Sequence, residues 1–182
     1  MIFKSYILEQ NLDAINSLKM FLFYGENHGL KKEFKEKIKN LSKSQETLNF
    51  FQDEIIKNKD ILLSEITNKS LFNEKKVIFI NEVSEKIIDI IDDVSNYMQN
   101  EKIFLFADVL DKKSKLRSYF EKSKFSGIAA CYQDNEITFR KIIMKKLSGY
   151  YGLSTEVINL IIQNTVLDRN KLNNEIDKIS SC

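Results

Sequence analysis

Short runs of apolar residues alternate, over the first 134 residues, with segments in which apolar side chains recur every three or four positions. The runs have the length of strands and lie at residues 20–24, 47–51, 77–80, 103–107 and 127–131. The segments between them have the spacing of amphipathic helices, as Leu30, Phe34 and Ile38 illustrate. Continuously apolar strands separated by such helices predict an α/β fold, with a parallel sheet covered by helices on both faces.

The pattern changes after residue 134, where apolar runs of strand length no longer occur. Three helical stretches follow, at about 136–149, 154–165 and 168–180, and Ser154 and Asp168 are the expected N-caps of the last two. We therefore predict an α/β domain at residues 1–134 and a small domain of three helices at residues 135–182.

Composition and charge narrow the classes of protein that the chain can belong to. Of its 182 residues 43% are hydrophobic and 30% charged, as in a folded globular protein, and the net charge of +2 does not by itself argue for nucleic-acid binding. The apolar runs are shorter than a membrane span, and the first residues do not resemble a secretory leader. Cys131 and Cys182 lack metal-ligand spacing, so we expect reduced thiols in a cytoplasmic protein. Because the apolar runs are too short to span a bilayer, we also expect no contact with membranes.

The segment GENHGLKKE, from Gly25 to Glu33, follows the first predicted strand and opens a helix. This is the position of a phosphate-binding loop, whose pattern is G-x-x-x-x-G-K-[ST]. Here the loop is one residue short, Leu30 separates Gly29 from Lys31, and neither Ser nor Thr follows that lysine. Gly25, Gly29 and Lys31 therefore form a degenerate phosphate loop that we do not expect to bind nucleotide. A tight strand-to-helix turn that needs both glycines explains them better.

The segment VIFINE, from Val77 to Glu82, resembles the strand end that holds magnesium in many ATPases. Its first acidic position is occupied by Asn81, whose neutral amide cannot replace a carboxylate on the metal. Two defects in one chain predict a fold that has lost ATP hydrolysis, with neither a cofactor nor a metal.

Other catalytic arrangements have little support in the sequence. The single histidine, His28, lies within the glycine segment, and the helical spacing places Asp89, Asp92 and Asp93 on a solvent-facing side. We therefore expect no catalytic activity of this chain.

Two further segments have more than one interpretation. The basic run from Asp111 to Lys124 could contact DNA, although Leu116 and Phe120 fit the buried side of a helix whose lysines simply face water. Leu71 and Phe72 stand in a polar connection, and they either fill the core or anchor a partner protein.

Four segments, in register, resemble the delta subunit of the clamp loader of bacterial DNA polymerase III: FLFYGENHGLKKEF, SLFNEKKVIFINEV, FADVLDKKSKLRSYFEK and LDRNKLNNEIDKI. The resemblance implies an AAA+-type fold, with a RecA-like parallel sheet flanked by helices and followed by a three-helix lid. It also implies a protein that binds and opens the sliding clamp during DNA replication without hydrolysing ATP.

In this family the residues that contact the clamp (the beta subunit) correspond to Leu71 and Phe72, with Ser70 beside them. The family's C-terminal collar domain, which joins the other clamp-loader subunits, has no counterpart in this chain, and DNA contact is expected only in the assembled loader. The chain would be a subunit of a DNA-directed DNA polymerase, a nucleotidyltransferase complex, in the cytoplasm at the nucleoid-associated replisome. Two alternatives remain: a small P-loop-type ATPase or kinase, and another ATP-inert AAA+ adaptor, such as the delta-prime paralogue.

Overall fold

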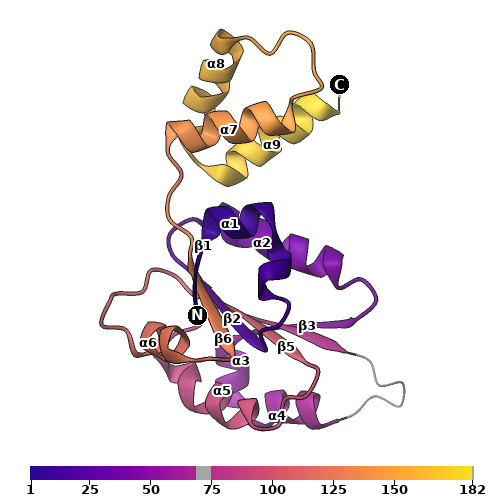
Figure 1. The fold of residues 1–182 in the computed structure, drawn as a ribbon, viewed down its shortest axis with the longest axis vertical. Helices are drawn as coiled ribbons and strands as arrows, with labels where there is room; N and C mark the ends of the chain where they lie inside the picture. The colour runs from indigo at the N-terminus through magenta and orange to yellow at the C-terminus, as the bar shows by residue number, and fades with distance from the viewer. Residues whose placement is uncertain (69–74, 182) are drawn as a thin grey trace.

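The computed structural model describes residues 1–68 and 75–181, and in this part of the chain a parallel sheet carries helices on both faces (Figure 1). The described strands pair in the order β1-β6-β2-β5-β4-β3. They are β1 (Ile2–Lys4), β2 (Met20–Tyr24), β3 (Glu46–Phe51), β4 (Lys76–Asn81), β5 (Lys102–Phe106) and β6 (Ser126–Ala130). All of these pairs are parallel, as the apolar runs predict.

One face of the sheet packs against α1 (Ser5–Gln10), the 3-10 helix η1 (Leu12–Ile15) and α2 (His28–Leu41). Alternate strand residues point to this face, and many are aromatic: Phe21, Phe23, Phe79, Phe104 and Phe106. The other face packs against α3 (Gln52–Lys57), α4 (Asp60–Thr67), the 3-10 helix η2 (Glu85–Ile87), α5 (Ile88–Ser95) and α6 (Lys115–Lys122). Its strand residues are aliphatic, among them Leu22, Ile78, Ile80, Ile103 and Leu105. We call the sheet with α1–α6 the sheet unit.

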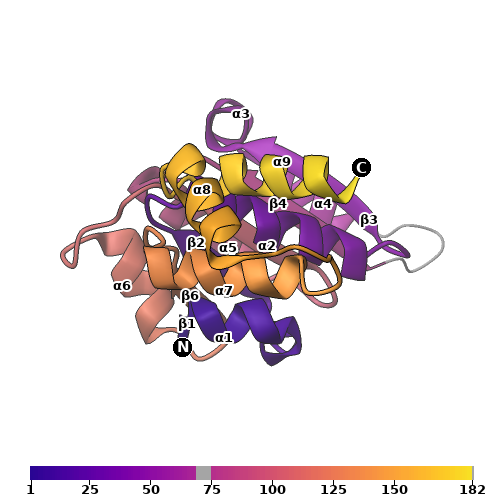
Figure 2. The ribbon, with the colours of Figure 1, turned by 90° about the horizontal axis from the view of Figure 1, so that it is seen from above.

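The last three helices, α7 (Glu136–Lys146), α8 (Thr155–Thr165) and α9 (Arg169–Ser180), form the helical unit. They share a core of their own that includes Phe139, Ile143, Ile162 and Leu172. The predicted caps are confirmed, because Ser154 accepts a hydrogen bond from the backbone N–H of Val157, and Asp168 caps α9 in the same way. The separate core supports a boundary near residue 134, and the division into two domains stays a prediction. Seen from above, α7 and α9 lie over the layer of α1 and α2 (Figure 2).

The structure differs from the sequence-based expectations in several elements. The N-terminal strand β1 and helix α1 were not predicted. Between the runs at 47–51 and 77–80 the spacing predicts an amphipathic helix, and the described part of this segment contains two helices, because α3 ends at Lys57 and α4 begins at Asp60. Burial alternates along β3, which is an edge strand, so its outward residues face solvent instead of a second layer. Within the described residues, no helix is both long and apolar enough to cross a membrane.

Candidate functional site

The turn after β2 needs glycine at its first position because of its backbone conformation and its close contact with the end of β6. Gly25 has a φ of +123°, and a Cβ added there would lie 2.4 Å from the carbonyl oxygen of Cys131, at the end of β6. The same carbonyl accepts a hydrogen bond from the backbone N–H of Asn27 at 3.0 Å. The N–H of Gly25 donates to the carbonyl of Asp108 at 3.1 Å. Gly25 is therefore held between the ends of two neighbouring strands.

Gly29 lies inside α2 and not in the turn, so the expectation that the turn needs both glycines is wrong for this residue. A Cβ at Gly29 would lie 2.7 Å from the Cβ of Arg169 and 3.0 Å from the backbone nitrogen of Asn170. The first turn of α9 therefore lies directly against the first turn of α2. The N–H of Leu30, one of the amides a phosphate would use at this helix end, instead donates to the side chain of Asn27 at 2.9 Å.

Lys31, the lysine of the degenerate phosphate loop, is buried and already has partners in the protein. Its Nζ donates to the carbonyl of Ala107 at 2.8 Å and to Oδ1 of Asp108 at 3.3 Å. Both acceptors follow strand β5. The ammonium group therefore binds the end of the neighbouring strand, and reaching a phosphate would require it to leave the Ala107 carbonyl.

Asn81 ends β4 at the position where a magnesium-binding carboxylate would be expected. Its Oδ1 accepts a hydrogen bond from Nζ of Lys35 at 2.8 Å, and its Nδ2 donates to the carbonyl of Phe50 at 2.8 Å. Burial lowers the pKa of Lys35, and the nearby Lys39 lowers this pKa further. An ammonium group bound to this amide oxygen disfavours a divalent cation at the same atom by like-charge repulsion.

Two cavities lie at this carboxyl edge of the sheet. The smaller, of about 310 Å³, is lined by residues that include Lys31, Lys35 and Asn81. The larger, of about 740 Å³, has four acidic residues in its lining: Glu82, Glu85, Asp108 and Asp111. A negative lining repels a polyphosphate, so the roomier cavity is electrostatically unsuited to the ligand that the loop pattern suggests.

The remaining candidate groups do not form a catalytic arrangement. His28 is the first residue of α2, its side chain is 69% exposed, and its Nδ1 lies 3.9 Å from Oδ1 of Asp108, too far for a hydrogen bond. On α5, Asp89, Asp92 and Asp93 are exposed, as predicted. Among residues 1–68 and 75–181, no group of three or more His, Cys, Asp or Glu side chains is placed to hold a metal ion.

The basic run on α6 has acidic neighbours. The hydroxyl of Tyr119 donates to Oδ1 of Asp92 at 3.0 Å, which joins α6 to the exposed aspartates of α5. Burial, and then this hydrogen bond, raise the pKa of Tyr119 to about 12. The charge of the surface is therefore mixed, which weakens the case for phosphate contact by this segment.

Ser70, Leu71 and Phe72 lie outside the described residues. The described elements on either side are α4, whose C-cap is Asn68, and β4, which begins at Lys76. In a parallel sheet the first residues of all strands share one edge, so β4 begins at the edge opposite the degenerate phosphate loop.

Sequence reasoning missed Arg169 and Asp134, which join the two units. One signal was present, because arginine is the first residue of the helix predicted after Asp168. The positive end of a helix dipole disfavours a cation there, so an arginine at this position indicates a specific anionic partner.

No protein-family model matches the chain. It is 26% identical over 172 residues to the protein described as probable DNA polymerase III subunit delta of Rickettsia prowazekii, and the alignment covers 92% of this chain and 52% of that protein. The chain thus spans about half the length of this curated relative.

Solved structures show the same fold. The delta protein of the Bacillus subtilis DNA clamp loader matches with a TM-score of 0.67 and 13% identity, over 97% of this chain and 57% of that one. Domain III of the Thermotoga maritima replication initiation protein DnaA matches with a TM-score of 0.54 and 16% identity, over 96% of this chain and 81% of that one. The predicted AAA+-type fold is confirmed. As its motifs predict, this chain is similar over nearly its whole length to the delta subunit of bacterial DNA polymerase III.

Proposed function

We propose that this chain is a clamp-loader delta subunit, or the part of one, that binds a sliding clamp and shifts the ring toward its open form. The observation that carries the proposal is the similarity to a DNA polymerase III delta subunit over 92% of the chain. The fold shared with a clamp-loader delta protein supports it. Assembly with the other loader subunits, and DNA contact within that assembly, belong to the same proposal.

We propose further that the chain neither binds nor hydrolyses ATP. Lys31 is bound to Ala107 and Asp108, and Asn81 accepts a hydrogen bond from the ammonium group of Lys35. The start of α2, where a phosphate would bind, lies against α9. Each contact would have to break before a nucleotide could occupy the loop in the usual way.

The clamp-binding role of Leu71 and Phe72, with Ser70 beside them, rests on the sequence resemblance alone. An aromatic and an aliphatic side chain that enter an apolar pocket are typical anchors of a protein interface. Binding that favours the open ring over the closed ring shifts the equilibrium by the difference between the two affinities. The two anchors would supply affinity, and the polar residues around them would form the rim.

A calorimetric titration of this chain against its cognate sliding clamp tests the proposal. We expect binding without nucleotide, and we expect Leu71→Ala combined with Phe72→Ala to weaken it by about 2–4 kcal/mol, or about 30- to 1,000-fold. The matched control is Leu41→Ala combined with Phe125→Ala, which removes the same two kinds of side chain from positions that are 65% and 73% exposed. This control should bind like the parent chain.

Two results would contradict the proposal. The parent chain could fail to bind the clamp, or the two double variants could lose equal affinity. The nucleotide part is tested separately by titration with magnesium and ATP. Micromolar binding that Lys31→Ala abolishes would favour the ATPase alternative over the ATP-inert subunit.

A further inference from the structure

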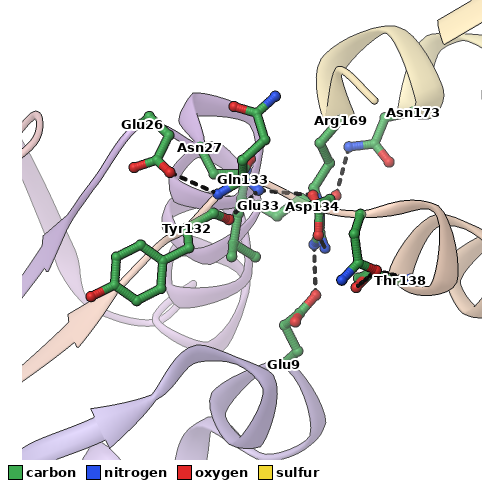
Figure 3. A network of polar contacts seen from close by, with 12 residues as sticks. Glu9, Glu26, Asn27, Glu33, Tyr132, Gln133, Asp134, Thr138, Arg169 and Asn173 are labelled. Atoms are coloured by element: carbon green, nitrogen blue, oxygen red, sulfur yellow. Dashed lines mark hydrogen bonds and ion pairs between the residues drawn. The ribbon is translucent and has the colours of Figure 1, made fainter. Parts of the chain in front are cut away.

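A buried arginine joins the helical unit to the sheet unit (Figure 3). Arg169 begins α9, and its side chain is only 1% exposed. Its Nε and Nη2 donate to the two carboxylate oxygens of Asp134 at 2.8 and 2.7 Å, a bidentate pair. Its Nη1 donates to Glu9 at 2.6 Å and to Glu33 at 3.1 Å. One guanidinium therefore binds three carboxylates.

These carboxylates come from separate parts of the protein. Glu9 lies in α1, Glu33 lies in α2, and Asp134 lies in the segment between β6 and α7. Burial opposes the charged form of Arg169, yet hydrogen bonds and the nearby negative charges raise its pKa above the ordinary value. The arginine thus stays positively charged and links α9 to two helices of the sheet unit and to the connecting segment.

Two amides hold two of the three carboxylates, Asp134 and Glu33, in place. Asn27, the N-cap of α2, donates through Nδ2 to Asp134 at 2.8 Å, and Asn173 of α9 donates to Glu33 at 2.7 Å. Both bonds join residues that are far apart in the chain. Because the acceptors are themselves oriented, the fork of Arg169 fits them in one geometry.

The apolar cores do not link the helical unit to the sheet unit. Among the described residues, the core of the helical unit contains only residues of α7–α9 and their connections, and the two cores of the sheet unit contain only residues that precede α7. Hydrophobic burial is non-directional, whereas a bidentate ion pair fixes both distance and angle. The relative orientation of the units therefore depends on polar contacts and on the close approach at Gly29. The contacts of Arg169 are the most numerous of these, and Glu33 adds a hydrogen bond from Asn173 at 2.7 Å and an ion pair with Lys146 at 4.0 Å.

We propose that Arg169 is a latch that fixes the helical unit in one orientation over the start of α2. When the latch is removed, both units stay folded, but the helical unit samples a range of positions and uncovers Gly29. The inference does not depend on clamp binding, and its test includes no clamp, so either proposal can fail without the other.

The test measures the distance between the units by pulsed electron–electron double resonance. Spin labels are attached at Asn40→Cys on α2 and Gln163→Cys on α8, two exposed positions, in a chain that also carries Cys182→Ser. With Arg169 present we expect one narrow distance distribution. Arg169→Met should broaden and shift it, and Arg169→Lys, which keeps the charge but loses the fork, should broaden it less.

The matched control is Arg117→Met. Arg117 also pairs with a carboxylate, Glu121 at 2.7 Å, but both residues lie within α6. Its removal should leave the distribution unchanged. Circular dichroism shows whether each variant keeps its helices. The proposal requires that both Arg169 variants keep them.

A narrow, unshifted distribution in Arg169→Met would overturn the proposal. Loss of helical signal in both Arg169 variants would also overturn it, because Arg169 would then be needed for folding itself and not for orientation. Hydrogen exchange gives an independent readout. The amides of residues 28–31 should exchange faster in Arg169→Met while those buried within α8 do not, and equal rates in the parent and the variant would contradict the latch.

Discussion

Replacing Gly25 by alanine should destabilise the protein much more than the same replacement at Gly152. Both glycines have positive φ angles, of +123° and +85°. Alanine in such a conformation costs on the order of 1–3 kcal/mol, and this cost is common to the two variants. The pair therefore forms an internal comparison in which both variants carry a backbone cost of this order.

The variants differ in what the new methyl group meets. At Gly25 it would lie 2.4 Å from the carbonyl oxygen of Cys131 and 3.0 Å from the carbonyl carbon, whereas at Gly152 there is no atom within 4 Å among the described residues. The backbone of Cys131 cannot move away freely, because its N–H donates to Tyr24 at 2.6 Å and its carbonyl accepts from Asn27. Overpacking of this kind costs about 1–3 kcal/mol. We therefore expect a loss of about 2–6 kcal/mol for Gly25→Ala and about 1–3 kcal/mol for Gly152→Ala.

Urea unfolding followed by circular dichroism measures both values, and equal slopes against urea concentration would show that the unfolded states are comparable. Equal losses of unfolding free energy in the two variants would refute the reasoning, because the contact with Cys131 would then carry no cost. A larger loss at Gly25 would show that the first glycine of the degenerate phosphate loop is needed for packing between strand ends, whatever the loop binds.

Two further predictions concern single polar groups. Asn81→Asp should lower the free energy of unfolding by about 1 kcal/mol or more, because a carboxylate oxygen would then face the carbonyl of Phe50 without a donor. It should not create binding of magnesium and ATP, since Lys35 stays beside the new carboxylate, and calorimetric detection of such binding would contradict this. Tyr119→Phe should lose less stability than the parent chain as the pH rises from about 10 to 12. Burial and the bond to Asp92 raise the pKa of Tyr119 from 10.0 to about 12 in the folded protein only. The unfolded parent chain therefore releases this proton first, and its folded state loses stability over this pH range. Urea unfolding across this pH range measures the difference, and parallel curves would contradict it.

Most of the strands that sequence analysis located have residues buried on both faces, and the edge strand β3, along which burial alternates, is the exception. Residues 77–80 and 103–107 are continuously apolar because helices cover both sides of β4 and β5. Strand β1 has three residues and, in the described part of the chain, pairs with β6 alone, and Ile2 is 71% exposed. Its extended conformation depends on a partner from the far end of the sheet unit, which a local pattern does not reveal.

The position of the degenerate phosphate loop could be predicted from the sequence, but the contacts that its residues make could not. The pattern from Gly25 to Lys31 indicated a strand-to-helix turn, and the structure has one there. The reason for Gly29 could not be found, because the atoms that exclude a side chain belong to Arg169, near the other end of the chain. The acceptors of the Lys31 ammonium also come from another strand end. Non-local contacts of this kind leave only indirect signals in the sequence, such as an arginine at the start of a helix.

Each residue of the degenerate phosphate loop has a structural role that does not involve a phosphate. Gly25 allows β2 to approach the end of β6, Gly29 allows α9 to approach α2, and Lys31 binds the carbonyl at the end of β5. A loop can therefore keep glycines and a lysine in a phosphate-loop arrangement after its ligand is lost, because replacing them would create clashes or leave a buried carbonyl without a donor. The residues that distinguish a working site are the hydroxyl after the lysine and the carboxylate at the end of β4. In this chain those two positions carry Lys32, which is exposed, and Asn81, whose amide is bound by Lys35 and by the carbonyl of Phe50.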